Sequence, residues 1–205
     1  MLNAKGFDLW ADGYDRSVQL SEESDEYPFA GYKDVLNAVY RAVHARAHAS
    51  VLDLGFGTGV LTAKLYAEGY AVSGVDFSPR MIALAQVKMP GARLIQADFT
   101  QGIPATLLGE RFDFIISTYA MHHLTDPQKA ALWRALLQQL APDGALIIGD
   151  VAFATESEQE ACCLRAGDGW DNDEAYVVAQ RFYTEFPGLR FERISHCAGI
   201  LTLKR

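Results

Sequence analysis

The sequence contains no run of about 18 consecutive apolar residues, the length that a membrane-spanning helix requires. Its N-terminal residues also lack the apolar stretch of an export signal. It has only 3 cysteines, and they form no Cys-x-x-Cys pair of the kind found in zinc sites and redox motifs. An odd number of cysteines suits a reducing compartment better than a disulfide framework. We therefore expect a cytoplasmic protein without a membrane partner.

Positive charge is also scarce, because 18 Lys and Arg residues stand against 26 Asp and Glu residues and leave a formal net charge of −8. No cluster of Lys and Arg is present, whereas nucleic-acid binding requires one to neutralise phosphates. We therefore expect no nucleic-acid partner. The length of 205 residues fits one domain, which can bury a sufficient core without disulfides or a structural metal.

Short apolar runs alternate with helix-like stretches along most of the chain. Strands that alternate with helices indicate a parallel sheet covered on both faces. The last two strands are joined by too few residues for a crossover, so they must pair antiparallel. We therefore predict a doubly wound α/β fold with a C-terminal antiparallel hairpin. The expected strands are 50–54, 70–75, 92–97, 112–118, 145–151, 190–196 and 199–204, and the expected helices are 30–48, 58–68, 79–88, 127–141, 156–164 and 174–186.

Two of these helices carry a clear start signal. Ser78 followed by Pro79, and Asp126 followed by Pro127, each predict an N-cap residue with proline at the first helical position.

A glycine-rich segment, DLGFGTG at 53–59, follows the first expected strand. Gly55 would permit the tight turn, Gly57 would let the backbone approach a ligand, and Gly59 would allow close contact between helix and strand. Because glycine-rich turns also occur for packing alone, this loop is weak evidence for a cofactor by itself.

Acidic residues at the ends of successive strands narrow the choice of ligand. A dinucleotide-binding loop would have glycine at position 60, where this chain has Val60. Asp53 would repel a phosphate and attract an ammonium group. Asp76 follows the second strand and could accept both hydroxyls of a ribose, while Asp98 and Phe99 follow the third and could bind and cover an adenine. The pattern indicates a ligand with an amine, a ribose and an adenine but no phosphate.

These motifs resemble those of the class I S-adenosylmethionine-dependent methyltransferases. The resemblance covers about 50–150 closely and rests on the glycine loop, Asp76, ADF at 97–99 and STYAMHHL at 117–124. The segment FDLWADGYD at 7–15 is similar to the N-terminal segment of short bacterial members. The resemblance implies a Rossmann-like, seven-stranded, mostly parallel sheet and S-adenosyl-L-methionine as the cofactor.

The resemblance also assigns positions around the cofactor. Asp53 and the glycines would face its methionine end, Asp76 its ribose and Asp98 its adenine. The residue after the fourth strand, Ser117 or Thr118, would lie beside the methyl donor, and Tyr14 would close the methionine end as part of an N-terminal lid. The expected cofactor-binding residues are Asp53, Gly55, Gly57, Gly59, Asp76, Phe77, Asp98, Phe99, Ser117 and Tyr14.

Methyl transfer mainly requires alignment of the acceptor with the methyl group, although an acceptor can also need its proton removed. His122 and His123 follow the fourth strand. Because one of two consecutive residues generally points inward, we expect His122 to face the pocket as a general base, with Tyr119 as a second catalytic candidate. The alternative, that both histidines only bond to loop backbone, stays open. We expect no metal ion.

The segment after the fourth strand lacks the Asn- or Asp-Pro-Pro-Tyr/Phe motif of enzymes that methylate nucleobase and glutamine amino groups. A small-molecule acceptor is therefore favoured. Trp170 and Tyr176 flank the irregular stretch 167–173, where such an acceptor could bind, with core packing as the alternative.

We therefore expect a single methyltransferase domain, as a monomer or homodimer. Within 1–205, it would comprise an N-terminal lid and helical segment (1–48), a cofactor-binding core (49–150), and substrate-side helices with the terminal hairpin (151–205). An NAD(P)-dependent oxidoreductase is disfavoured by Val60, by Asp53 and by the lack of a Tyr-x-x-x-Lys pair. A non-catalytic protein that binds S-adenosylmethionine or S-adenosylhomocysteine remains a second alternative.

Overall fold

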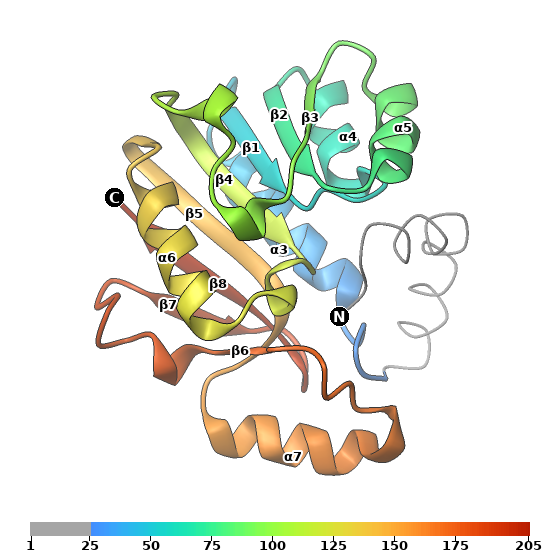
Figure 1. Cartoon of the computed structure of the whole chain (residues 1–205), viewed down its shortest axis with the longest axis vertical. Coiled ribbons are helices and arrows are strands. Elements are labelled where there is room, and N and C mark those ends of the chain that lie inside the picture. The colour runs from blue at the N-terminus through green and yellow to red at the C-terminus, as the bar shows by residue number, and fades with distance from the viewer. Residues whose placement is uncertain (1–25) are drawn as a thin grey trace.

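The structure is a computed structural model, and it describes residues 26–205 (Figure 1). The segment 7–15, including Tyr14, lies outside the described residues. No helix of the described part is long and apolar enough to cross a membrane.

Helices and strands alternate along the chain as the sequence predicts. The helices are α3 (Tyr32–His44), α4 (Val60–Ala67), α5 (Pro79–Lys88), α6 (Asp126–Leu137) and α7 (Glu156–Ala166). The strands are β1 (Ser50–Leu54), β2 (Ala71–Asp76), β3 (Arg93–Gln96), β4 (Phe112–Thr118), β5 (Leu140–Phe153), β6 (Val177–Val178), β7 (Arg190–Arg193) and β8 (Ala198–Lys204). Short 3₁₀ turns are η1 (Phe99–Gln101), η2 (Ala105–Leu107), η3 (Met121–His123), η4 (Gly167–Gly169) and η5 (Ala179–Arg181).

The strands form one sheet in the order β3-β2-β1-β4-β5-β8-β7. The first five strands of the chain pair in parallel, whereas β8 is antiparallel to both β5 and β7. This arrangement confirms the predicted fold with its C-terminal hairpin. The short strand β6 pairs with β5 outside that order and was not predicted.

The prediction of a helix over 174–186 is wrong. Val177 and Val178 form β6 opposite Ala152 and Phe153 of β5, and the 3₁₀ turn η5 follows. Both valines are fully buried. β-Branched residues pack well in a sheet, so pairing with β5 outweighs the weak helical pattern of this segment.

One of the two predicted helix starts is confirmed, and the other is displaced by one residue. Ser78 caps α5 by accepting a hydrogen bond from the Met81 N–H at 3.1 Å. In α6, however, the N-cap is Thr125 rather than Asp126, because the Thr125 N–H donates to the Gln128 side chain at 2.9 Å. The Asp126 carboxylate instead pairs with Lys129.

Helices cover both faces of the sheet (Figure 1). On one face, α6 packs against β5, and its Leu132, Trp133 and Leu136 join a core with buried residues of β1, β4, β5 and β8. On the other face, α3 and α4 pack on the sheet with α3 contributing Val35, Val39 and Val43. These three valines recur every four residues and so share one side of α3.

We predict that Gly149→Ala destabilises the fold. A Cβ atom at this β5 position would overlap the Val35 side chain and lie 3.1 Å from Ile200 Cδ1. Overpacking of this kind costs about 1–3 kcal/mol. Urea unfolding measures the loss, with Gly188→Ala as the control, since its Cβ would meet no atom within 4 Å. Equal stability of the two variants would contradict close packing of α3 on β5.

Candidate active site

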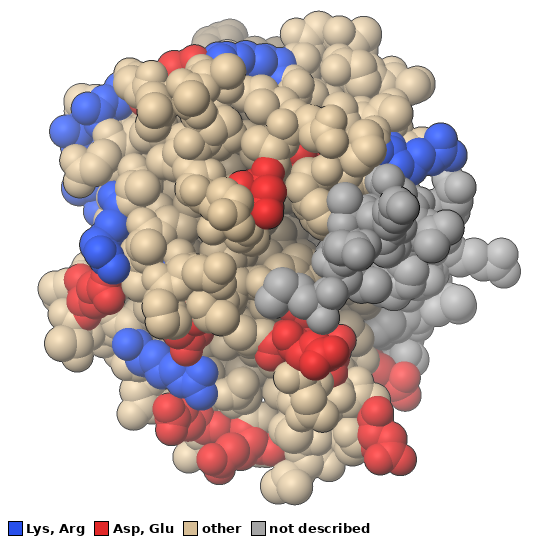
Figure 2. Space-filling model, in the orientation of Figure 1, with Lys and Arg blue, Asp and Glu red and all other residues tan. Residues whose placement is uncertain are grey.

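A cavity opens where the carboxyl ends of β1, β2 and β4 meet. Seven of the predicted site residues line it: Asp53, Gly55, Gly57, Asp76, Phe77, Phe99 and Tyr119. On the face seen in Figure 2, Lys and Arg of the described residues lie toward the margins, and the charged side chains near the centre are acidic. This electrostatic setting does not favour a phosphate.

The glycine loop brings its backbone to the cavity. Gly55 and Gly57 have φ values of 72° and 56°, a region that favours glycine. A Cβ at Gly55 would lie 2.5 Å from the Ala120 Cβ, whereas one at Gly57 would meet no atom of the described residues within 4 Å. Gly59 faces α5 instead, since its Cβ would lie 3.2 Å from the Ala85 Cβ. The loop is therefore tightly packed at Gly55 and open at Gly57.

Asp76 joins the end of β2 to this loop. Its Oδ2 accepts a hydrogen bond from the Gly57 N–H, and its Oδ1 accepts one from the Ser78 N–H, both at 2.9 Å. Only 4% of the residue is exposed. Asp76 thus fixes the loop and also presents a carboxylate to the cavity.

Asp53 is fully buried and lines the cavity. Its Oδ2 accepts a hydrogen bond from the Thr62 hydroxyl, while Oδ1 has no hydrogen-bond partner among the described residues. Burial, together with the nearby charge of Asp76, raises the pKa of Asp53 to about 7. A buried carboxylate oxygen without a partner is costly, and an ammonium group from a ligand would satisfy it.

Three predicted cofactor positions do not line the cavity among the described residues. Gly59 packs on α5, as described above. Ser117 is buried, and its hydroxyl donates to the Leu54 carbonyl at 2.8 Å, whereas its neighbour Thr118 faces the cavity. Asp98 is exposed, and its Oδ1 accepts from the Thr100 N–H at 2.9 Å, which caps a short 3₁₀ turn. Successive strand residues point to opposite faces, which explains why Thr118 rather than Ser117 reaches the cavity.

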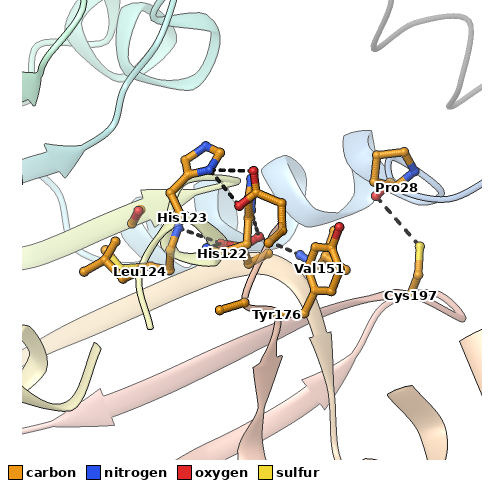
Figure 3. A network of polar contacts seen from close by, with 12 residues as sticks. Pro28, His122, His123, Leu124, Val151, Tyr176 and Cys197 are labelled. Carbon is orange, nitrogen blue, oxygen red and sulfur yellow. Dashed lines mark hydrogen bonds and ion pairs between the residues drawn. The ribbon is translucent and has the colours of Figure 1, made fainter. Parts of the chain in front are cut away.

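The structure reverses the expected orientation of the two histidines. His122 Nδ1 lies 2.6 Å from Asp150 Oδ1, and Asp150 is fully buried in β5. Figure 3 shows His122 and His123 within this network of polar contacts. Burial disfavours the charged form of His122, but the charge and hydrogen bond of Asp150 outweigh it and raise the pKa of His122. Asp150 thus favours the protonated form of His122, and His122 does not line the cavity.

His123 is the histidine on the cavity wall. Its Nδ1 lies 2.9 Å and 3.1 Å from the two carboxylate oxygens of Glu174. Burial and the neighbouring charge of His122 lower the pKa of His123 despite this carboxylate. Glu174 was not predicted from the sequence, because no spacing rule connects it with His123, which lies 51 positions earlier.

His122, His123 and Glu174 also offer three ligand-type atoms that all lie within 4.8 Å of one another. Within 26–205 this is the one such group that could hold a metal ion. Each histidine already directs Nδ1 to a carboxylate, so the arrangement also has the form of two hydrogen-bonded His–acid pairs.

Aromatic rings form part of the cavity wall. The Tyr32 and Tyr119 ring centroids lie 5.0 Å apart, and the Phe29 and Tyr119 ring centroids lie 5.5 Å apart. Tyr119 directly follows β4 and has a φ of 51°, which is unusual for a bulky residue. This backbone conformation sets the direction of its ring. Trp170 and Tyr176 do not line this cavity and pack against each other with centroids 4.8 Å apart.

Comparisons with known proteins agree with this geometry. Residues 51–144 match a family model described as a methyltransferase domain. An uncharacterized methyltransferase of Anoxybacillus flavithermus is 34% identical over 190 residues, which cover 93% of this chain and 86% of that protein. One of Geobacillus kaustophilus is 36% identical over 179 residues, covering 87% and 80%.

Solved structures share the fold. A magnesium protoporphyrin IX methyltransferase of Synechocystis PCC 6803 with bound SAH has a TM-score of 0.69 at 19% identity, covering 95% of both chains. The DhpI-SAM-HEP complex has a TM-score of 0.67 at 18% identity, covering 97% of this chain and 94% of that one.

We predict that Asp53 makes stability depend on pH in the ligand-free protein. Its pKa rises from an ordinary 3.8 to about 7 on folding, so between these values the unfolded chain ionises while the folded one keeps its proton. Stability therefore falls as the pH rises through this window. Between pH 5 and pH 8 the loss should be about 2–3 kcal/mol, and it should be absent in Asp53→Asn. Urea unfolding of both proteins at the two pH values measures it, and parallel pH profiles would refute the buried-acid assignment.

Proposed function

The chain belongs to the class I S-adenosylmethionine-dependent methyltransferases, and on this basis we propose that it methylates a small-molecule acceptor in the cavity at the ends of β1, β2 and β4. The observation that carries the proposal is the buried Asp53 oxygen, which has no hydrogen-bond partner within 26–205, beside a glycine loop that these residues leave open at Gly57. The bound cofactor supplies an electrophilic methyl group on a sulfonium sulfur. The chain's own residues must bind it, align the acceptor and exclude water.

The residues around the cavity fit this cofactor. Asp53 would accept hydrogen bonds from the ammonium group of the methionine end, next to the Gly55–Gly57 backbone. Asp76 would accept hydrogen bonds from the ribose hydroxyls with the same carboxylate that accepts from the Gly57 and Ser78 N–H groups. Phe77 and Phe99 offer ring surfaces to the adenine. The acids would thus contact the polar parts of the cofactor, and the aromatic rings would contact its adenine.

The remaining predicted positions contribute less directly. We propose that Asp98 meets the adenine amino group at the rim, that Gly59 holds α4 close to α5, and that Ser117 fixes β1 to β4 through Leu54. Tyr14 lies outside the described residues and keeps its predicted role over the methionine end.

A small molecule is the acceptor that the cavity suits best. Tyr32, Leu36 and Tyr119 give the wall an apolar and aromatic character. The acidic net charge of −8 does not suit nucleic acid. An oxidoreductase and a non-catalytic binding protein are not favoured.

His123 is the proposed proton acceptor in place of His122. His123 lines the cavity, and a pKa below the ordinary histidine value keeps it neutral at physiological pH. His122 is held away by Asp150. Tyr119 is proposed to confine the acceptor beside the methyl group with its ring.

The first test is binding and turnover. S-adenosylhomocysteine at 100 times its dissociation constant should stabilise the protein by about 2.7 kcal/mol in thermal unfolding, whereas NADH should have no effect. Labelled methyl transfer from S-adenosylmethionine should then appear in a screen of small metabolites and not with RNA. Stabilisation by NADH alone, or transfer only to RNA, would refute the proposal.

The second test is Asp76→Ala. Loss of charged hydrogen bonds to the ribose should weaken S-adenosylhomocysteine binding by at least about 10-fold. Calorimetric titration measures the affinity, with circular dichroism to confirm the fold and Asp168→Ala, an exposed acid in η4, as the control. Because Asp76 also fixes the glycine loop, Asp76→Asn provides a milder second variant. Unchanged affinity in both Asp76 variants would exclude the ribose contact.

A further inference from the structure

We propose that Glu174 and His123 act together to remove a proton from the methyl acceptor, so that the acceptor is a compound with a hydroxyl or thiol group. This inference rests on the proposed function and names the substrate class for the same cavity. Glu174 is a positioning residue, because it acts through His123.

The contact between the two side chains is well defined. Both Glu174 oxygens lie within 3.1 Å of His123 Nδ1. The side chains are only 19% exposed for His123 and 12% for Glu174. An Nδ1–H that donates to a carboxylate leaves Nε2 with the lone pair and fixes the orientation of the ring. This is the tautomer that a general base requires.

The backbone beside Glu174 is anchored to the histidine segment. The Ala175 N–H donates to the His122 carbonyl at 2.9 Å. Lys129 is fully buried, and its ammonium group donates to both the Leu124 and the Ala175 carbonyl oxygens. Two segments far apart in sequence are therefore clamped together on either side of His123. The position of Glu174 is thus built into the fold and is not that of an exposed loop acid.

The charges around His123 suit a reversible proton acceptor. The His122 ring, whose protonated form Asp150 favours, has its centroid 4.1 Å from that of His123 and disfavours a positive charge there. Glu174, with a pKa lowered largely by the hydrogen bond from His123 against the effect of burial, stays ionised and stabilises the imidazolium once it forms. His123 therefore starts neutral and can hold a proton transiently.

The proton and electrons balance without a further reactant. The acceptor's O–H or S–H bond breaks, the proton moves to His123 Nε2, and the electron pair stays on the acceptor atom. That atom bonds to the methyl carbon while the carbon–sulfur bond breaks, and its electrons remain on the sulfur, which becomes a neutral thioether. His123 then releases the proton to water.

The first readout is the titration of His123 by nitrogen NMR in the complex with S-adenosylhomocysteine, assigned with His123→Gln. The wild-type ring should carry its proton on Nδ1. In Glu174→Gln, loss of the carboxylate charge should lower the His123 pKa by about one unit. Asp173→Asn removes a neighbouring exposed acid and should leave the pKa in place. An unchanged His123 pKa and tautomer in Glu174→Gln would overturn the proposal.

The second readout is the pH profile of methyl transfer to the acceptors found by the labelled screen. Glu174→Gln should lower the rate by at least about 10-fold and move the rising limb to lower pH, with unchanged affinity for S-adenosylhomocysteine. Glu174→Asp should recover part of the rate. Methylation only at carbon or at nitrogen, unaffected by Glu174→Gln, would overturn the proposal.

A metal ion is the competing outcome for these side chains. Manganese and zinc titrations test it directly. The proposal would also be overturned if the wild-type protein bound one equivalent of metal, if both His123→Gln and Glu174→Gln abolished that binding, and if a chelator abolished wild-type methyl transfer. A wild-type protein that neither binds S-adenosylhomocysteine nor transfers methyl groups would contradict the proposed function itself. Normal wild-type transfer together with an unaffected Glu174→Gln variant would contradict only the present inference.

Discussion

The parallel pairing of β1 with β2 and β4 is the constraint on which the site depends. In this register Asp53 of β1 pairs with Gly74 of β2 on one side and with Ile116 of β4 on the other. Parallel strands end at the same edge of a sheet, so the side chains that follow them are forced together. The Asp76 bond to the Gly57 N–H then ties the end of β2 to the loop after β1. The cavity is therefore a consequence of strand order.

Electrostatics divides this edge of the sheet into two regions. On the cofactor side, Asp53 and Asp76 are buried acids, and the described cavity wall contains no Lys or Arg. Asp53 keeps an acceptor oxygen without a partner among the described residues, which is costly without a ligand and favours a cationic ligand. On the histidine side, Asp150 pairs with His122, Glu174 pairs with His123, and Asp126 pairs with Lys129. The first region suits a cationic ligand, and in the second each histidine has a carboxylate partner.

Local signals predicted most of the fold. The glycine loop and the Ser78–Pro79 pair are contiguous in sequence and were placed correctly because their geometry is decided within a few residues. The segment 174–186 was assigned wrongly because pairing of Val177 and Val178 with β5 is a long-range contact. The start of α6 was misjudged by one residue because Thr125 and Asp126 are both good caps, and the reach of Gln128 decides between them.

The sequence by itself determined the α/β sheet, its terminal hairpin and the family, because strand ends, glycines and acids follow one another at short, fixed offsets. It also identified Asp53 and Asp76 as residues of the same edge, where the structure has them lining one cavity. Only the tertiary structure decided which histidine faces that cavity. His122 and His123 are equivalent by sequence, and their partners Asp150 and Glu174 lie 28 and 51 residues away. Folding brings those carboxylates into contact, and a buried charge pair then fixes each ring, which no local pattern can encode.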